Sequence, residues 1–426
     1  MKAKFGKVFW IVILMEFFER GSYYGLMSVL ALYLGSTERG GVLGFEEHSV
    51  GILMGTITPL LYFLPIMSGA LAERFGGRRT LVVAFTLLAI GYGASGFVTS
   101  YPAVFATLLV MALGAGTFKP IPSGTIARVT DASNSTLGFG IFYWTINLGA
   151  FVFPLVLVNW LKGIDWSYVF LLSAAGTGLM ILPTLLAYRE PPRPENRKTL
   201  AEVLAGALLV LRDWRFVLMI AVYSGFWILY FQMFHTVLWY LKDHVDMAPV
   251  EAAVNGALAV AGLGTRFVFD VEHVTVLNAG TIILLQLLVS RVVASSPALP
   301  TMIAGIAIGT CGMGLLALSS HAWVFIVGVV IFSIGEMTTH PKFISYVGLI
   351  APKDKVALYM GYMFLYGVIG SSVGGLIGGY GYEHFVKELQ QPRLLWLLFC
   401  GIGVATIVGL AAFHFLVAKR RTSPPA

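Results

Sequence analysis

The sequence contains few charged residues and almost no cysteine for its length. Of its 426 residues only 12% are charged, whereas 58% are hydrophobic, and the mean hydropathy is +0.83. A soluble protein of this size could not keep that much apolar surface away from water. The two cysteines, Cys311 and Cys400, fall in separate apolar runs and give no support to a disulfide framework or a metal site.

Patterns typical of enzymes are also missing. The sequence shows no Ser/His/Asp triad, metal-ligand cluster or phosphate-binding loop, and we expect no appended soluble domain. We therefore do not expect an enzyme. The net charge of +7 comes from basic residues in short loops, where membrane orientation explains them without nucleic acid as a partner. The first apolar run carries Glu16, Glu19 and Arg20 and continues to Leu34, so we expect no cleavable signal.

Apolar runs of about twenty residues recur along the whole chain, and each is long enough to cross a hydrocarbon core of ~30 Å. This pattern predicts an all-α, multi-pass membrane protein with twelve transmembrane helices. The expected spans are Val8–Leu34, Ser49–Leu71, Thr80–Val98, Ala103–Ile126, Leu137–Trp160, Tyr168–Ala187, Phe216–Leu241, Val274–Val293, Met302–Leu318, Trp323–Ile350, Ala357–Tyr380 and Leu394–Val417.

Two segments between the spans are distinctive. The stretch REPPRPENRK follows the sixth span and predicts an exposed linker, after which Thr199–Leu211 has the pattern of a short amphipathic helix at the interface. The second segment, Lys242–His273, is of mixed polarity, and its NGALAVAGLG stretch is too short and glycine-rich to span. We expect a re-entrant or extracellular loop there.

Basic residues set the expected orientation. They precede the first span, follow the second and the tenth, fill the central linker and end the chain, so they share one side if the number of spans is even. Because cytoplasmic loops are enriched in Lys and Arg, we expect both termini in the cytoplasm. The expected location is the plasma (inner) membrane. The expected domains are an N-terminal six-helix bundle (1–188), a cytoplasmic linker with an amphipathic helix (189–213) and a C-terminal six-helix bundle (214–426).

The stretch EFFERGSYYG places three ionisable side chains in the first span. On a helix, Glu16 and Arg20 are i,i+4 neighbours, and Tyr23 and Tyr24 lie about one turn beyond Arg20. A charge at bilayer depth costs at least ~2.5–3.5 kcal/mol, so such residues usually face a partner or a water-filled cavity. A self-neutralising pair that staples the bundle is the alternative, but Glu19 makes two carboxylates beside one arginine.

Further polar groups lie within other predicted spans: Lys119 in GTFKP, Asn147 in FYWTINLG, Asn278 in VLNAG, and Glu336 with His340 in GEMTTHP. Each of these residues has a structural alternative. Lys119 could extend its ammonium to the lipid headgroups, and the asparagines could form hydrogen bonds that hold two helices together. His340 could be a neutral residue packed in the protein interior. Three deep carboxylates against two deep cations leave one carboxylate unbalanced, which a proton or a cationic group of a solute would neutralise. This pattern favours a proton-coupled carrier of zwitterions.

Several motifs carry a family resemblance. The loop SGALAERFGGRR resembles the GxLADRxGRR signature of major facilitators, whose fold has two six-helix halves. EFFERGSYYG resembles the ExxERFxYYG motif of proton-dependent oligopeptide transporters, FYWTINLG their FYxxINxG, and GEMTTHPKFISYVGLIAP their GExxxSPxGLSxxxxLAP. GTFKP matches their fourth-helix lysine motif. FWILYFQ and VLNAG are similar to their FWxxxEQ and LNP motifs, and Tyr62 stands where the family has a second-helix tyrosine.

The resemblance implies alternating-access symport of di- and tripeptides with protons. Its implied proton-coupling residues are Glu16, Glu19 and Arg20, to which our reading of the sequence adds Glu336 and His340. The implied substrate-binding residues are Tyr23, Tyr24, Tyr62, Lys119, Asn147, Trp227, Gln232, Asn278 and Glu336. Lys119 and Asn147 would take the peptide carboxylate, Asn278 and Glu336 its ammonium, and Lys119 would exchange a bridge with Glu336. No cofactor or metal is expected beyond the proton gradient, and the partners are the small solute and the lipid bilayer, with the chain a monomer.

The chain departs from this family at several positions. Met27 and Phe231 replace an arginine and a carboxylate that form a second bridge between the halves, Gly21 replaces the phenylalanine of the first motif, and the tenth-helix motif carries His340 and Lys342. The central linker also has no room for the two extra helices of many bacterial members. These departures keep open a relative that carries another anionic or zwitterionic solute or that works without proton coupling. A non-transporting sensor or a membrane enzyme is the rival of another class.

Overall fold

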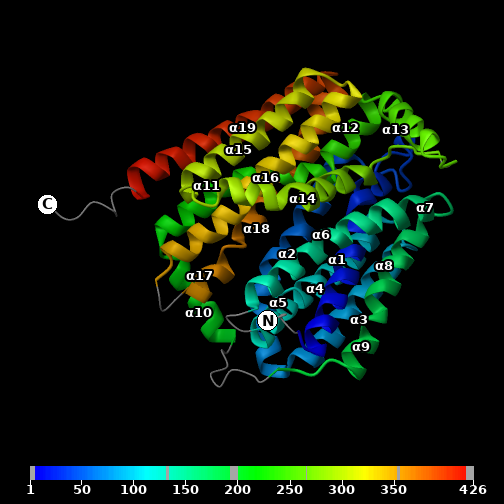
Figure 1. Ribbon diagram of the computed structural model, residues 1–426. Coiled ribbons are helices and arrows are strands. Elements are labelled where there is room, and N and C mark those ends of the chain that lie inside the picture. The colour runs from blue at the N-terminus through cyan, green and yellow to red at the C-terminus, as the bar shows by residue number, and fades with distance from the viewer. Residues whose placement is uncertain (1–4, 131–133, 192–199, 265, 353–355, 419–426) are drawn as a thin grey trace. The chain divides into compact units, whose positions relative to one another are not determined.

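The computed structural model describes residues 5–130, 134–191, 200–264, 266–352 and 356–418, and in these ranges helices are the only regular elements (Figure 1). Most of the central linker sequence, including Pro192 to Lys198, lies outside the described residues, as do the basic C-terminal residues and Lys353 and Lys355. The side chain of Glu73 in the SGALAERFGGRR loop also lies outside what is described.

The first six expected spans are all helical, and three of them consist of more than one helix. Their elements are α1 (Lys7–Leu34), α2 (Glu47–Phe75), α3 (Gly77–Ser95), α4 (Tyr101–Phe118) with α5 (Pro120–Val129), α6 (Ser135–Val152) with the π-helix η2 (Phe153–Val158) and α7 (Asn159–Lys162), and α8 (Ser167–Leu179) with α9 (Ile181–Leu186). A short 3₁₀ turn, η1 (Thr37–Arg39), follows α1, and α10 (Leu200–Leu211) occupies the segment where an interfacial helix is expected.

The last six expected spans are helical too. Their elements are α11 (Trp214–Phe231) with the 3₁₀ turn η3 (Gln232–Phe234) and α12 (Thr236–His244), α14 (Glu272–Val293), α15 (Ala298–Leu318), α16 (Ala322–Ile350), α17 (Val356–Tyr362) with α18 (Leu365–Gly381) and the π-helix η4 (Tyr382–Glu388), and α19 (Pro392–Phe413) with the π-helix η5 (His414–Ala418).

Ten of the described helical stretches are long and apolar enough to cross a membrane. The helices of the expected first and third spans, α1 and α3, are not among the ten, although they have 28 and 19 residues. The chain is therefore an all-α, multi-pass membrane protein, and the count of twelve spans stays a prediction.

The segment 242–273 differs from the loop expected there. A helix, α13, occupies Ala248–Val260, and only its last residues and the turn after it contain the glycine-rich stretch. With 13 residues the helix is shorter than the ~20 that a bilayer requires. Glu251 and Asn255 explain why the segment is ordered. The Glu251 carboxylate accepts a hydrogen bond from the backbone of Phe269 at 2.8 Å, and the Asn255 amide exchanges two bonds with the backbone of Phe267.

The helices form two compact units. The first consists of Met1–Met27, Leu53–Trp214 and Ala357–Val368, and the second of Ser28–Ile52, Arg215–Val356 and Ile369–Ala426. Within the first unit α3 packs against α4 and α8, and within the second α15 packs between α16 and α19 (Figure 1). The units draw on both halves of the sequence, and the predicted domain boundaries at 188 and 214 stay predictions.

Candidate functional site

The Arg20 side chain forms a tight pair with its neighbour Glu19. Its Nε lies 2.5 Å from Glu19 Oε2, and its Nη2 donates a second hydrogen bond of 2.7 Å to Glu19 Oε1. Both side chains are buried, with Glu19 fully so. Two parallel N–H···O bonds are the strong, bidentate form of an arginine–carboxylate pair. Glu19 is thus the main partner of Arg20, ahead of the i,i+4 neighbour Glu16 that helical spacing indicated.

Glu16 is the carboxylate that is left over. One of its oxygens, Oε1, lies 3.9 Å from Arg20 Nε, which is beyond hydrogen-bond length. The other, Oε2, is buried and has no hydrogen-bond partner among the described residues. A buried carboxylate oxygen without a donor is costly as an anion. The excess carboxylate that the charge count indicated therefore has an identified position on α1.

The two tyrosines of EFFERGSYYG lie beside the same guanidinium. Arg20 Cζ is 4.9 Å from the ring centroid of Tyr23 and 6.0 Å from that of Tyr24, both within the range of a cation–π contact. The two rings meet edge to face at 5.2 Å. Arg20 is thus held by one carboxylate and two rings, which leaves it in one orientation.

Gly21 is explained by close packing of α1 against α6 and η2. A Cβ at position 21 would lie 2.4 Å from the ring of Phe153, and one at Gly149 would lie 2.9 Å from the backbone nitrogen of Gly21. The Phe153 ring thus occupies the space beside α1 where a side chain at position 21 would begin. The family motif has a phenylalanine where this chain has Gly21. Here Phe153, 132 positions further along the chain, supplies an aromatic ring beside that position.

Lys119 lies at the break between α4 and α5. Pro120 and Pro122 cause the break, because proline removes a backbone donor and its ring crowds the preceding turn. The Lys119 ammonium lies 4.2 Å from the ring centroid of Tyr62 and 5.4 Å from that of Phe364. Among the described residues of the first unit, no carboxylate lies within ion-pair distance of it. The ammonium thus contacts aromatic rings and does not extend along α5 toward its end at Val129.

Asn147 is bound to its own helix. Its Nδ2 donates to the carbonyl oxygen of Tyr143 at 3.0 Å, and its side chain is nearly buried. One amide proton is therefore used within α6. The structure does not bring Asn147 into contact with Lys119, so their joint role in binding a carboxylate stays a prediction.

In the second unit the structure brings Asn278 and Glu336 together. Asn278 Nδ2, on α14, donates to Glu336 Oε2 on α16 at 3.0 Å and to the hydroxyl oxygen of Ser333 at 2.9 Å. Among the described residues of this unit, no cation lies within ion-pair distance of Glu336. This carboxylate is thus oriented by an amide and has a second oxygen with which to meet a cationic group.

His340 lies in an aromatic cluster on the second unit. Its Nδ1 is 3.3 Å from the hydroxyl of Tyr223, and its ring meets that of Trp227 edge to face at 5.2 Å. Lys342, two residues on, is placed differently. Its ammonium donates to the backbone carbonyls of Ala294 and Ser296 at the end of α14, at 3.1 and 2.8 Å. Lys342 thus caps that helix end.

Gln232 does not expose a group that a solute could contact. Its side chain is completely buried in η3. Its Nε2 donates to the carbonyls of Ile228 and Gly374 at 2.7 and 3.1 Å, and its Oε1 accepts from the Thr236 hydroxyl at 2.6 Å. These bonds join α11, α12 and α18. We therefore correct the expectation of a substrate-binding residue here to a residue that holds three helices together.

The remaining predicted residue pairs have one member in each unit. Lys119 and Met27 belong to the first unit, and Glu336 and Phe231 to the second. The exchange of a bridge between Lys119 and Glu336 therefore stays a prediction, as does the mutual position of Met27 and Phe231. Both of these apolar side chains are buried.

Residue motifs alone missed four neighbours of these groups. They are Phe364 beside Lys119, Tyr366 beside Tyr62, Ser333 beside Asn278 and Tyr223 beside His340. Ser333 could have been found, because it precedes Glu336 by three residues and so shares its helix face. Tyr223 likewise precedes Trp227 by four residues. Phe364 lies in the turn between α17 and α18, and Tyr366 lies in the first turn of α18. Both are far along the chain from Lys119 and Tyr62, and no local spacing indicates them.

Comparison with known proteins places this fold in a family. The family model of the Major Facilitator Superfamily matches residues 9–271 and 268–426, which together cover almost the whole chain. The chain belongs to the Major Facilitator Superfamily, a class of membrane transporters and not of enzymes.

Several known transporters are similar to this chain, either in sequence over part of its length or in fold. The dipeptide and tripeptide permease A of Klebsiella pneumoniae is 28% identical over 208 residues, which are 48% of this chain and 40% of that protein. The match thus spans less than half of that relative's length. A crystal structure of a POT family transporter in complex with 5-aminolevulinic acid has a TM-score of 0.77 at 21% identity, covering 96% of both chains. A nucleoside transporter reaches 0.75 at 15% identity, covering 95% of this chain and 99% of that one.

Proposed function

We propose that the protein is a proton-coupled symporter of di- or tripeptides, or of similar zwitterions, that works by alternating access. The observation that carries the proposal is the buried, unbalanced carboxylate Glu16 beside the Glu19–Arg20 pair. The similarity to permeases of dipeptides and tripeptides supports the substrate class. The proton gradient is the energy source, and no cofactor enters the cycle.

Glu16 is the proposed site of proton loading. As an anion it has one buried oxygen without a donor, and a proton removes that charge. Loss of the proton leaves a carboxylate 3.9 Å from Arg20, whose guanidinium Glu19 already holds. Loading and release at Glu16 therefore change the net charge around Arg20 by one unit while the Glu19–Arg20 pair persists. His340, which contacts Tyr223 and Trp227, is a second proposed proton site.

The solute is proposed to bind through its two charged ends. Lys119 suits a carboxylate, because its ammonium faces aromatic rings and no carboxylate of its own unit competes for it. Glu336 suits an ammonium, because Asn278 orients one of its oxygens. Tyr23, Tyr24, Tyr62, Trp227 and Asn147 are the proposed remaining contacts. We place the protein in the plasma (inner) membrane as a monomer with both termini in the cytoplasm.

The experiment is uptake of radiolabelled dipeptides into proteoliposomes under an imposed pH gradient, inside alkaline. The intact protein should accumulate peptide, and Lys119→Ala and Glu336→Gln should lose accumulation. Lys342→Gln is the matched control, because this lysine caps α14 and should leave uptake within about twofold of the intact protein. Absence of gradient-dependent uptake for every member of a varied dipeptide panel would refute the proposal.

A second candidate is transport of another zwitterionic or anionic solute. Two observations favour it. Met27 and Phe231 are apolar where the resemblance indicates an ion pair in peptide transporters, and the chain shares its fold with a POT family transporter in complex with 5-aminolevulinic acid. Competition of unlabelled 5-aminolevulinic acid with dipeptide in the same assay separates the candidates. Met27→Arg with Phe231→Glu should be tolerated better than Met27→Arg alone, since a lone buried charge is costly. Equal damage would count against this explanation of the pair.

A further inference from the structure

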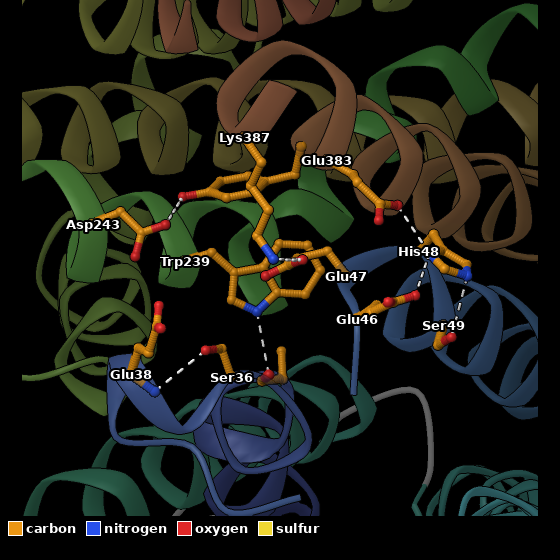
Figure 2. A network of polar contacts seen from close by, with 12 residues as sticks. Ser36, Glu38, Glu46, Glu47, His48, Ser49, Trp239, Asp243, Glu383 and Lys387 are labelled. Atoms are coloured by element: carbon orange, nitrogen blue, oxygen red, sulfur yellow. Dashed lines mark hydrogen bonds and ion pairs between the residues drawn. The ribbon is translucent and has the colours of Figure 1, made fainter. Parts of the chain in front are cut away.

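A second polar cluster lies in the second unit and includes neither Glu336 nor His340 (Figure 2). Glu46 and His48 lie at the start of α2, and Glu383 lies in η4, 335 residues beyond His48. His48 Nδ1 is 2.9 Å from Glu383 Oε2 and 3.5 Å from Glu46 Oε2. Figure 2 shows the two carboxylates approaching the imidazole from different elements. The basic loop at Arg78 and Arg79 follows the other end of α2, so with cytoplasmic termini this cluster faces the outside.

The spacing of the three ligand atoms suits a small divalent cation. The imidazole nitrogen and the two carboxylate oxygens all lie within 4.8 Å of one another. Around tetrahedral Zn²⁺, whose Zn–N and Zn–O distances are about 2.0–2.2 Å, neighbouring ligand atoms are about 3.3–3.5 Å apart. The observed separations of 2.9 and 3.5 Å lie close to this range. Small rotations of the Glu46 and Glu383 side chains are sufficient to reach it.

The imidazole is held with Nδ1 toward the carboxylates. Its other nitrogen, Nε2, is 3.4 Å from the hydroxyl oxygen of Ser49, and its ring stacks on Tyr380 with centroids 5.5 Å apart. With a metal ion bound at Nδ1, the imidazole proton would lie on Nε2, where the Ser49 hydroxyl oxygen can accept it, as in the outer shell of known histidine sites. The orientation of His48 is thus set by contacts other than those to the two carboxylates.

The two elements that carry the ligands are braced against each other. One turn after Glu47, a Cβ at Gly51 would lie 2.8 Å from the Cα of Gly379, so α2 and α18 are in backbone contact there. The buried carboxylate of Glu47 also pairs with the Lys387 ammonium of η4. Side chains on a scaffold this close are preorganised, which lowers the ordering cost of binding an ion.

The local charge also calls for a cation. Lys387 forms its ion pair with Glu47. Glu46 and Glu383 are therefore left to share His48 Nδ1. One Nδ1–H can donate a well-directed hydrogen bond to only one of two carboxylates. A divalent cation at the same position would contact both carboxylates and the neutral imidazole at once. An imidazole among the ligands favours zinc and similar transition metals over Mg²⁺ or Ca²⁺.

We propose that Glu46, His48 and Glu383 form a binding site for Zn²⁺ or a similar transition-metal ion, with a fourth position open to water. A bound ion would cross-link the start of α2 to η4. The test for this site needs no transported solute, so the site and the proposed transport function can fail independently.

The experiment is calorimetric titration of the chelator-treated, untagged full chain in detergent with ZnCl₂. We expect one equivalent to bind, with affinity at least about tenfold lower in His48→Gln and in Glu383→Gln. The matched control is His384→Gln. His384 forms an exposed pair with Glu388 at 2.7 Å, one residue from Glu383 but without a third ligand, and its loss should leave zinc affinity unchanged.

Thermal unfolding supplies a second readout. Zinc should raise the Tm of the intact chain and of His384→Gln, because an ion that binds only the folded state stabilises it, and it should not raise that of His48→Gln. Glu46→Gln is the test variant if His48→Gln or Glu383→Gln does not fold. The Glu46 side chain is 69% exposed, so its replacement leaves the packing intact while it removes one metal ligand. Absence of zinc binding, unchanged affinity in Glu46→Gln, or an equal loss in His384→Gln would overturn the proposal and leave a simple His–Glu ion pair.

Discussion

Glu16 and Glu19 are three residues apart on one helix, yet their replacement should change the stability of the protein by very different amounts. Glu19→Gln removes the bidentate partner of a buried guanidinium. Breaking a buried pair in this way costs about 3–5 kcal/mol, because the remaining charge is left uncompensated. Glu19→Gln should therefore lower the free energy of unfolding by an amount in this range.

For Glu16 two opposing terms nearly cancel. Its closest approach to Arg20, 3.9 Å, corresponds to an attraction of about 4 kcal/mol at an effective dielectric constant near 20. Burial of the carboxylate costs several kcal/mol, and its Oε2 gains no hydrogen bond in return. Glu16→Gln should thus change the free energy of unfolding by less than about 1 kcal/mol.

Equilibrium unfolding of the detergent-solubilised chain, in mixed micelles with increasing sodium dodecyl sulfate and followed by tryptophan fluorescence, measures both effects. In the Glu19→Gln variant Arg20 could turn to Glu16, and the double variant Glu16→Gln/Glu19→Gln is the control for this rearrangement. The double variant Glu19→Gln/Arg20→Gln should recover part of the stability that Glu19→Gln loses, because it also removes the uncompensated guanidinium. In proteoliposomes Glu16→Gln should lose gradient-driven uptake and keep counterflow. If Glu16→Gln is as destabilised as Glu19→Gln, the assignment of Glu16 as the excess carboxylate is refuted.

Three further substitutions test the packing and the two proposed ends of the solute. Gly21→Ala places a Cβ 2.4 Å from the Phe153 ring and should cost about 1–3 kcal/mol of stability, with Phe153→Leu in the same chain recovering much of it; simple additivity would contradict this. Asn278→Leu removes the donor that orients Glu336, worth about 1.5–3 kcal/mol, and should raise the KM for dipeptide roughly ten- to hundredfold; an unchanged KM would exclude the role. Tyr62→Leu should weaken uptake by the 0.5–2 kcal/mol of a cation–π contact, about two- to thirtyfold, whereas Tyr62→Phe should not; equal effects would count against the contact with Lys119.

Much of the fold could be predicted from the sequence, because a bilayer imposes a simple rule. Backbone groups in hydrocarbon must be satisfied within the segment, so each long apolar run has to be helical. The helices α2, α14 and α16 begin and end within a few residues of the expected spans. The segment 242–273 escaped this rule, because a stretch too short to cross a bilayer folds according to its partners. Its helix α13 is held by Asn255 and Glu251.

Pairs within one helix, or between motifs recognised by resemblance, could also be predicted from the sequence. The proximity of Glu16, Glu19 and Arg20 follows from helical spacing, and the resemblance indicated Asn278 with Glu336. Spacing did not reveal which carboxylate Arg20 prefers, because side-chain torsions and packing decide between two neighbours that are both in reach. The resemblance also gave Gln232 a ligand-binding role, whereas contacts with α12 and α18 use its amide within the protein.

By itself, then, the sequence determined an all-α membrane transporter and the places along its helices where buried charge must be balanced. Hydrophobic length and the cost of burying charge are local properties that each segment carries with it. Only the tertiary structure decided which groups are in contact. Arg20 pairs with Glu19 rather than Glu16, Phe153 fills the space beside Gly21, and Glu383 lies beside His48. These contacts join positions up to 335 residues apart, and distances of that kind are set by helix packing, which no local pattern records.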